Sequence, residues 1–380
     1  MTALYLDHAA TSPVRPEVRE AMQPFLTSVF GNPSSHHSAG EAAAHALDDA
    51  RRRVARVLGM RAGDVVFTAG GTEANNLAVK GIVLAALERG ARHLVISPIE
   101  HESIGESAEY LRRFHGVEVT RLPVDAVGLI DPAQLAEALR PDTALVSFGH
   151  ANNEIGTVQH AEALIASARA AGVTVHVDAV QSAGWLPLHE LGADAVSIAG
   201  HKVGAPKGIG VLAVRGRVPV EPLLHGGGQE RGRRSGTENV AGAVALAVAL
   251  ELAEAERREV ATAVGAATYR FITAVLAAVP GAALTGHPER RLPATASFTF
   301  AGTSGESVLL ELERRGVISS SGSACAAGSD EPSPVLLACG IDPAVAQTSV
   351  RFSFGRAPLP DDAPEQLARV TAAAVAAVLG

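Results

Sequence analysis

Between residues 60 and 215, short runs rich in β-branched residues alternate with longer segments of helical pattern. The apolar residues of these runs are nearly continuous, as in strands of a sheet that helices cover on both faces. Such alternation of strands with helices predicts a mostly parallel sheet. The expected strands are 65–68, 93–97, 117–120, 144–148, 173–177, 195–198 and 210–214, with helices at 102–115, 131–140 and 160–171.

The segments on either side of this pattern predict further helices and a second, smaller α/β unit. A capping box at Ser38-Ala-Gly-Glu41 should open a helix that runs to Leu58, with Gly59 as its C-cap. An Ala- and Glu-rich helix is expected over about 238–260. The smaller unit is expected to contain strands 295–300 and 350–354 and helices 305–315 and 362–378.

The predicted organisation is a large domain over residues 16–255 and a small C-terminal domain over residues 256–380. The N-terminal segment 1–15 is assigned to the small domain. A chain of 380 residues is long enough for each domain to bury its own core.

Composition argues against several classes of function. A net charge of −8 does not suit a nucleic-acid binder that neutralises phosphates, although Arg231-Gly-Arg-Arg234 is locally basic. Two cysteines form neither a disulfide framework nor a zinc ligand set. No signal peptide is visible, and the longest apolar stretch, 241–250, is about half a membrane span. We therefore expect a soluble cytoplasmic protein with neither a membrane nor a nucleic-acid partner.

Lysine is nearly absent, which makes the remaining lysines informative. The chain has 29 arginines but only three lysines, Lys80, Lys202 and Lys207. A drift from Lys to Arg would keep lysine where arginine cannot replace it, and a guanidinium cannot form an imine with an aldehyde. Lys202 follows an apolar strand, whereas Lys207 lies in a Pro/Gly turn and Lys80 lies mid-helix. Lys202 is therefore the predicted imine lysine of a pyridoxal phosphate (PLP) enzyme.

Other residues at predicted strand ends carry groups that this cofactor needs. Asp178 could pair with the ring nitrogen of PLP, and a helix cap or loop salt bridge is the alternative. Gln181 could hydrogen-bond the ring hydroxyl. His101 could stack on the ring and shuttle protons, or be structural. The glycine-rich turn 69–75 before a helix favours a phosphate, although a plain tight turn has the same sequence.

Two residues of the smaller unit are candidates for handling substrate. Cys325 lies in a stretch rich in Ser, Gly and Ala, which predicts an exposed, mobile loop that suits a nucleophile visiting two sites. The alternative for a lone cysteine is a small buried hydrophobe, and we assign that role to Cys339. Arg351 lies on a predicted strand and offers the bidentate partner that an amino-acid carboxylate favours. A candidate thiol together with a PLP lysine indicates a PLP enzyme that handles sulfur.

Taken together and in this order, these segments resemble the cysteine desulfurases of the NifS/IscS type, within the class V aminotransferase-like PLP enzymes. The match covers nearly the whole chain, from Tyr5-Leu-Asp-His-Ala-Ala-Thr11 to the final helix. Its most specific segments are Ser321-Gly-Ser-Ala-Cys325 and Arg351-Phe-Ser353. The other matching segments are Phe30-Gly-Asn-Pro-Ser-Ser35, Thr68-Ala-Gly-Gly-Thr-Glu73, Asn152-Asn-Glu-Ile-Gly156, His176-Val-Asp-Ala-Val-Gln181, Gly200-His-Lys202, His225-Gly-Gly-Gly-Gln-Glu-Arg231 and Arg234-Ser-Gly-Thr237.

The resemblance implies PLP fold type I, in which helices sandwich a mostly parallel central sheet and a smaller C-terminal α/β domain follows. It implies that the catalytic residues are Lys202, which moves the Cα proton, Cys325, which bears a persulfide, and the stacking His101. Thr237 is implied to reach the phosphate of a neighbouring protomer, so a homodimer is implied too. The full set of implied cofactor-binding residues is Gly71, Thr72, Asn153, Asp178, Gln181, His201, Lys202 and Thr237, and the implied substrate-binding residues are Asn153 and Arg351.

The implied reaction converts L-cysteine to L-alanine and passes sulfur to Cys325, then to an acceptor protein for Fe–S cluster assembly or tRNA thiolation. The alternatives are a selenocysteine lyase, another class V PLP aminotransferase or, from a different class, a catalytically idle scaffold subunit. The chain departs from the family at Ala199, because members of the family often carry a hydroxyl residue there that binds the phosphate. The missing hydrogen bond would weaken cofactor binding by about 1 kcal/mol. Relatives that dock an iron–sulfur scaffold through a longer tail continue beyond the position of Gly380.

Overall fold

The computed structural model describes residues 3–321 and 331–380, and its larger part is built on a seven-stranded sheet in the order β2-β8-β7-β6-β5-β3-β4. Adjacent strands are parallel except where β8 pairs with β2 and with β7. The strands are β2 (Val65–Thr68), β3 (His93–Ile96), β4 (Glu118–Arg121), β5 (Thr143–Gly149), β6 (Thr174–Asp178), β7 (Ala195–Ala199) and β8 (Gly210–Val214). Every expected strand is confirmed to within one residue at each end, and so is the mostly parallel sheet.

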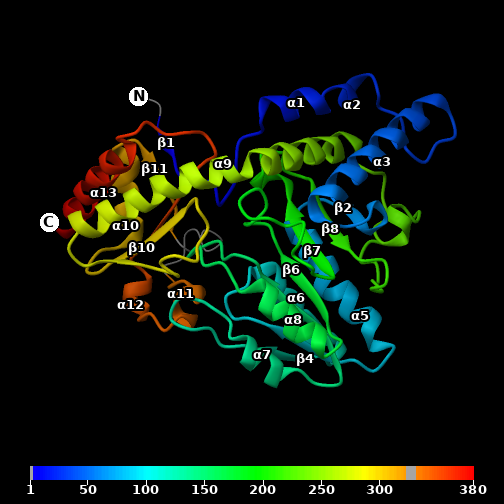
Figure 1. The fold of residues 1–380 in the computed structure, drawn as a ribbon, viewed down its shortest axis with the longest axis horizontal. Helices are drawn as coiled ribbons and strands as arrows, with labels where there is room; N and C mark the ends of the chain where they lie inside the picture. The colour runs from blue at the N-terminus through cyan, green and yellow to red at the C-terminus, as the bar shows by residue number, and fades with distance from the viewer. Residues whose placement is uncertain (1–2, 322–330) are drawn as a thin grey trace.

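Helices cover both faces of this sheet (Figure 1). On one face the core includes residues of α3 (Ser38–Leu58), α8 (Ala161–Ala170) and the first part of α9 (Val240–Ala278). On the other face it includes the consecutive helical segments of residues 71–87 and helix α6 (Glu102–His115). The remaining helices of this part are α1 (Pro16–Met22), α2 (Pro24–Thr27) and α7 (Pro132–Ala138), and the segments of 71–87 are α4 (Gly71–Asn76), η2 (Leu77–Gly81) and α5 (Ile82–Leu87).

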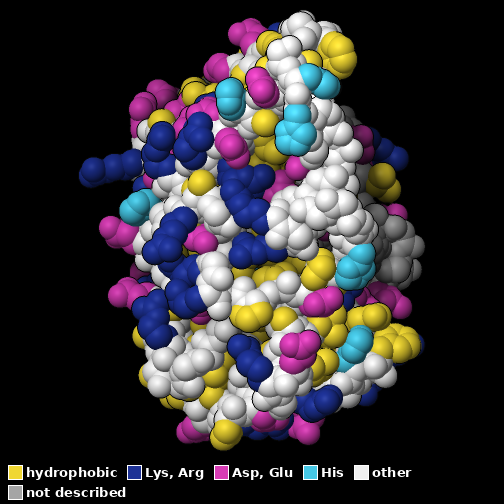
Figure 2. Space-filling view, turned by 90° about the vertical axis from the view of Figure 1, so that its right-hand side faces the viewer, with side chains coloured by type: hydrophobic (Ala, Val, Ile, Leu, Met, Phe, Trp, Pro, Cys, Tyr) yellow, Lys and Arg dark blue, Asp and Glu magenta, His cyan; other side chains and the backbone are white. Residues whose placement is uncertain are grey.

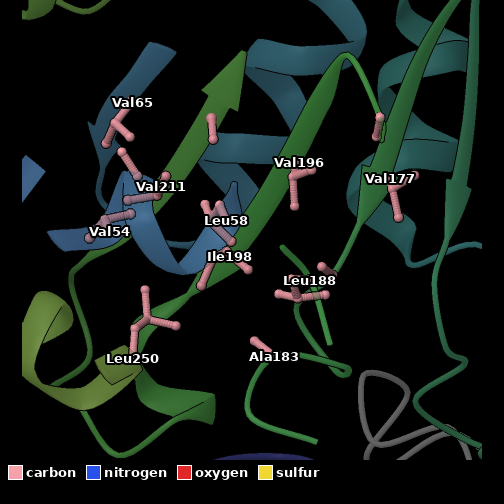
Figure 3. Close-up of a cluster of buried hydrophobic side chains, with 14 of the residues drawn as sticks. Val54, Leu58, Val65, Val177, Ala183, Leu188, Val196, Ile198, Val211 and Leu250 are labelled. Carbon is pink, nitrogen blue, oxygen red and sulfur yellow. The ribbon is translucent and has the colours of Figure 1, made fainter. Parts of the chain in front are cut away.

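Alternate residues of each strand enter the two cores. In β2, Val65 and Phe67 pack into one core and Val66 into the other, and all three are buried. Figure 3 shows part of the first core, where strand residues such as Val196 and Ile198 lie near Leu58 of α3 and Leu250 of α9. The nearly continuous apolar runs in the sequence follow from this burial on both faces.

The smaller part is an antiparallel sheet in the order β12-β10-β9, covered by helices. Its core contains Phe271, Phe298 and Phe352, whose rings meet edge to face at centroid distances of 5.0–6.2 Å. The N-terminal strand β1 pairs in parallel with β11 beside this sheet. The elements are β1 (Leu4–Tyr5), β9 (Ala282–Leu284), β10 (Thr295–Phe300), α10 (Gly305–Arg314), β11 (Val317–Ile318), α11 (Pro334–Ala338), α12 (Pro343–Ala346), β12 (Ser349–Ser353) and α13 (Ala363–Leu379).

Helix α9 joins the two parts and is much longer than the 238–260 that the sequence predicts. Its first eleven residues, 240–250, are almost all buried in the core of the large sheet, as predicted for this apolar stretch. Further along, Val264, Phe271 and Val275 enter the core of the small sheet, so the helix continues to Ala278. By length and composition alone α9 is apolar enough to cross a membrane. The domain boundary at residues 255 and 256 falls inside this continuous helix and stays a prediction.

The predicted capping box of α3 is wrong. The helix begins at Ser38 itself, and the N-cap is His37, whose Nδ1 accepts a hydrogen bond from the backbone N–H of Gly40 at 3.2 Å. The imidazole nitrogen of His37 therefore caps the helix in place of the expected serine hydroxyl. At the other end the prediction is confirmed, because Gly59 takes the left-handed conformation with φ of 62°.

A buried ion pair fixes the loop that precedes α9. Arg51 of α3 contacts both carboxylate oxygens of Glu230 at 2.6 and 2.9 Å, and the two side chains are only 5% and 2% exposed. Glu230 also accepts a hydrogen bond from the backbone N–H of Phe67 in β2. Glu230 and Arg231 both have positive φ, 49° and 59°, a conformation that costs non-glycine residues energy. The ion pair therefore holds a strained turn against the edge of the sheet.

Replacement of Glu230 by Ala is expected to lower the free energy of unfolding by about 3–5 kcal/mol, because Arg51 would keep a buried, unpaired charge. The matched control is Glu251→Ala, since Glu251 pairs with Arg53 but both side chains are about a third exposed. The free energy of unfolding of Glu251→Ala should fall by about 1 kcal/mol or less. Chemical denaturation of the two variants tests this, and equal losses would show that burial of the Arg51–Glu230 pair does not matter.

Candidate active site

One cavity lies where the parallel strands of the large sheet end, and it encloses about 330 Å³. Open α/β sheets bind their ligands at this carboxyl edge. Nearly all the residues predicted for the site line it, namely Gly71, Thr72, His101, Asn153, Asp178, Gln181, His201, Lys202 and Arg351. They come from turns that follow different strands and from β12 of the small sheet, so the fold brings together residues up to 280 positions apart.

The amino group of Lys202 is held at this cavity by the N-terminal segment. Lys202 lies in the short turn after β7, and its Nζ donates to the backbone oxygens of Ala9 and Ala10, the latter at 2.8 Å. Lys207 is exposed, as its turn sequence predicts. Lys80 is half-buried instead of solvated, and its Nζ lies 5.0 Å from the centre of the Tyr110 ring. Among the three lysines, only Lys202 lines the cavity.

Asp178 ends β6 and carries a buried carboxylate into the cavity wall. Its Oδ1 accepts from the backbone N–H of Val180 at 2.8 Å, and its Oδ2 accepts from Nδ2 of Asn75 at 2.7 Å. Gln181 lies nearby, and its Nε2 donates to the backbone oxygen of Ala9.

His201 is neutral at pH 7, because burial and then the neighbouring charges of Lys202 and Lys207 lower its pKa to about 4.

The turn between β2 and α4 comes very close to the end of β7. A Cβ atom on Gly71 would lie 2.9 Å from Cγ2 of Val180 and 3.2 Å from Cβ of Ala199, so no side chain fits there without a shift. The glycine lets the backbone of this turn line the cavity directly. Ala199 lines the same wall.

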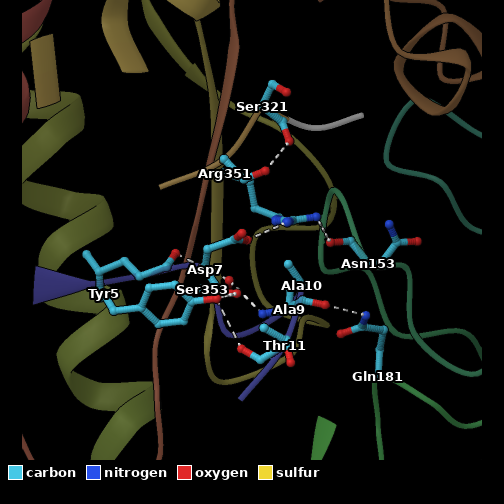
Figure 4. A network of polar contacts seen from close by, with 12 residues as sticks. Tyr5, Asp7, Ala9, Ala10, Thr11, Asn153, Gln181, Ser321, Arg351 and Ser353 are labelled. Carbon is cyan, nitrogen blue, oxygen red and sulfur yellow. Dashed lines mark hydrogen bonds and ion pairs between the residues drawn. The ribbon is translucent and has the colours of Figure 1, made fainter. Parts of the chain in front are cut away.

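Arg351 enters the cavity from β12 and is tied to two other segments (Figure 4). Its Nη2 pairs with Oδ1 of Asp7 at 2.8 Å, and its Nη1 donates to the backbone oxygen of Asn153 at 2.9 Å. The Arg351 side chain is 2% exposed and the Asp7 side chain 18% exposed, so the guanidinium is almost completely removed from water. The N-terminal segment is also held by Ser353, whose Oγ accepts from the backbone N–H of Ala9.

Glu100 is a partly buried residue in the cavity wall whose carboxyl group sequence reasoning missed. Burial raises its pKa from 4.5 to about 8, and the charge of Asp178 acts in the same direction. Oγ of Ser97 donates to Glu100 Oε1 at 2.5 Å, and this hydrogen bond lowers the pKa of Glu100, so it offsets part of the rise in pKa. Glu100 is therefore mostly protonated at pH 7, beside an Asp178 whose two oxygens both accept hydrogen bonds. Its position next to His101 at a strand end was the signal available in the sequence.

One described residue that was predicted for the site, Thr237, is not brought to this cavity. Thr237 is exposed in the loop before α9 and does not line the cavity of its own chain. Cys325 lies outside the described residues, so its exposed, mobile loop stays a prediction. Cys339 is buried as predicted, 7% exposed, and burial raises its pKa to about 11. A thiol with such a pKa is a poor nucleophile at neutral pH.

Besides Glu100, sequence reasoning missed Asp7 and Asn75, the partners of Arg351 and Asp178. Asp7 lies in a segment that resembles the family and Asn75 in the glycine-rich turn 69–75, but neither has a local pattern that indicates a role. The locally basic segment Arg231-Gly-Arg-Arg234 has an acidic partner in the fold. Figure 2 shows Lys and Arg side chains gathered in a band on the face at the right of Figure 1, with acidic side chains beside them. Arg234, for example, pairs with Glu73 at 2.9 Å.

Comparison with known proteins agrees with this architecture. The family model described as aminotransferase class-V matches residues 4–363. A cysteine desulfurase IscS from Dictyoglomus turgidum is 44% identical over 93% of this chain and 89% of its own. A solved NifS-like protein superposes with a TM-score of 0.91 at 33% identity, over 99% of this chain and 100% of its own. The solved structure titled SspA in complex with cysteine is 36% identical, with a TM-score of 0.80 over 94% of this chain and 100% of its own.

The chain belongs to the class-V aminotransferase family, and within it to the cysteine desulfurases. The resemblance inferred from the motifs is thereby confirmed, and so is the fold type I architecture.

Replacement of Glu100 by Gln is expected to flatten the dependence of stability on pH. A carboxyl whose pKa rises on folding, here from 4.5 to about 8, stabilises the fold at low pH, and this stability is lost as the pH rises through that range. Between pH 5 and 8 the free energy of unfolding of the wild type should fall by at least about 1.4 kcal/mol more than that of Glu100→Gln, equivalent to one pKa unit. Parallel curves in urea denaturation across this range would contradict a buried, protonated Glu100.

Proposed function

We propose that this protein is a PLP-dependent cysteine desulfurase that converts L-cysteine to L-alanine and transfers the sulfur to its own Cys325. The observation that carries the proposal is the single cavity that Lys202, Asp178 and Arg351 share. An amine, a ring-nitrogen carboxylate and a carboxylate-binding guanidinium are the groups that PLP chemistry on an amino acid requires. Because relatives of the chain are named cysteine desulfurases, we favour this reaction over the others that the fold supports.

The residues of the cavity fit PLP. Lys202 provides the primary amine for the aldehyde, and the Asp178 carboxyl group provides the partner of a protonated ring nitrogen. The turn at Gly71 packs too closely to admit a Cβ atom. Its backbone N–H groups are proposed to bind the phosphate, with Thr72 and His201 beside it. Gln181 is proposed to hydrogen-bond the ring hydroxyl and His101 to stack on the ring. The bound cofactor would supply a sink for the electron pair left when the Cα proton is removed.

The chain's own residues then perform three tasks. Arg351, with Asn153 beside it, binds and orients the substrate carboxylate, and its pairing with Asp7 fixes the guanidinium plane before substrate arrives. Lys202 removes the proton from Cα and holds it. The Cys325 thiolate forms an S–S bond to the substrate sulfur while the bond from Cβ to that sulfur breaks, and protonation of Cβ completes alanine.

Two further proposals concern partners and location. The exposed Thr237 is proposed to reach the phosphate bound by a neighbouring protomer, so the working unit is a homodimer. The persulfide on Cys325 is proposed to pass to an acceptor protein for Fe–S cluster assembly or tRNA thiolation in the cytoplasm. Both proposals rest on the family to which the chain belongs.

The proposed function is tested by measuring alanine and sulfide from L-cysteine plus a reductant, with the wild type and Cys325→Ala side by side. We expect both products from the wild type and a loss of at least about a hundredfold in the variant, because no other nucleophile takes the sulfur. Cys339→Ala is the matched control and should keep its activity, since Cys339 is buried outside the cavity.

Equal product from the wild type and Cys325→Ala would remove Cys325 from the mechanism and leave a more general PLP lyase. A strong preference for selenocysteine over cysteine would instead indicate a selenocysteine lyase. Protein that binds PLP but releases neither product would support a scaffold subunit.

A further inference from the structure

Two buried side chains outside the proposed mechanism, Asn75 and Ser103, lie between Asp178 and His101. They are 2% and 7% exposed. Nδ2 of Asn75 lies 2.7 Å from Oδ2 of Asp178 and 2.9 Å from Oγ of Ser103. Oγ of Ser103 lies 2.8 Å from Nδ1 of His101. A continuous chain of hydrogen bonds therefore joins the carboxylate proposed to pair with the ring nitrogen to the imidazole proposed to stack on the ring.

The donors and acceptors among these groups fix the direction of each hydrogen bond that joins them. Both oxygens of Asp178 accept hydrogen bonds, so the Asn75 amide must present its NH₂ group to this carboxylate. One of its two hydrogens goes to Asp178 and the other to Oγ of Ser103. The Ser103 hydroxyl then has its own hydrogen left to donate to Nδ1 of His101.

A second donor points at the same imidazole nitrogen. The backbone N–H of Ser103 donates to Nδ1 of His101 at 3.1 Å, which makes His101 the N-cap of α6. An imidazole nitrogen that accepts hydrogen bonds cannot carry a proton. His101 is therefore neutral, with its single proton on Nε2.

We propose that Asn75 and Ser103 are positioning residues that hold His101 in the neutral Nε2–H tautomer and tie its ring to the Asp178 carboxylate. The inference rests on the proposed function, because PLP chemistry is what gives the imidazole its task. A fixed tautomer means that the one polar hydrogen of the ring is always Nε2–H. A fixed ring plane means that stacking requires no reorganisation when substrate binds.

Helix capping alone does not account for this arrangement. The cap needs only the backbone N–H of Ser103 and the imidazole of His101, and it makes no use of Asn75. Asn75 is also an expensive residue to bury, because within the described part of the chain its Oδ1 has no hydrogen-bond partner. A role in orienting Asp178 and Ser103 explains why an amide stands at this position.

The tautomer of His101 can be measured directly by ¹⁵N NMR of the holoenzyme labelled at histidine, with the His101 signals assigned by their loss in His101→Gln. In the wild type the proton is expected on Nε2. Ser103→Ala leaves the backbone N–H of Ser103, at 3.1 Å, as the one remaining donor to Nδ1, and Asn75→Leu no longer orients the Ser103 hydroxyl. In both variants we expect a measurable fraction of the Nδ1–H tautomer, and a kcat for alanine release lower by about tenfold or more with a smaller change in KM. Ser103→Thr keeps the hydroxyl and should restore the wild-type signals.

The matched control is Ser107→Ala, which removes another buried hydroxyl of α6, one that donates to the backbone oxygen of Ser103 and not to the chain of bonds. It should leave the tautomer unchanged. A proton on Nδ1 in the wild type, or the same tautomer in Ser103→Ala, Asn75→Leu and the control, would overturn the proposal. The NMR signals need no turnover, so the expected tautomer in a protein that releases no alanine would contradict the proposed function alone.

Discussion

The common direction of the strands in the large sheet is the constraint on which the site depends. Every strand of that sheet except β8 runs the same way, so the turns after β2, β3, β5, β6 and β7 all open at one edge. These turns carry Gly71, His101, Asn153, Asp178 and Lys202, respectively. Helices on both faces keep water from the strands, and polar residues therefore concentrate at the edge. The cavity lies at this edge, where side chains from the ends of several strands meet.

The N-terminal segment completes that cavity by contacting both parts of the molecule. Ala9 and Ala10 accept hydrogen bonds from Lys202 of the large part, while Asp7 pairs with Arg351 of the small sheet. The proposed imine lysine and the proposed substrate clamp are thus oriented by residues only a few positions apart in the chain. Because Arg351 is almost completely buried, its pairing with Asp7 also removes the cost of an isolated charge.

Local pattern predicted the elements of this fold well and their long-range contacts poorly. The strands of the large sheet follow from apolar runs, and Lys202 stands out because lysine is so rare in the chain. Helix α9 was predicted about 18 residues too short, since the residues that extend it pack only against the distant small sheet. The pairing of Asp7 with Arg351 spans 344 positions, and no local pattern marks it. Glu100 likewise has an unusual pKa only because the fold buries it beside Asp178.

The proposed function requires the cavity at the carboxyl edge to hold PLP through Lys202. Treating the purified protein with borohydride fixes pyridoxal phosphate to whichever lysine holds it, and digestion followed by mass spectrometry identifies that residue. We expect a single modified peptide, with the pyridoxyl group on Lys202 and none on Lys80 or Lys207. A label on either of those two lysines, or no label in protein supplied with PLP, would contradict it.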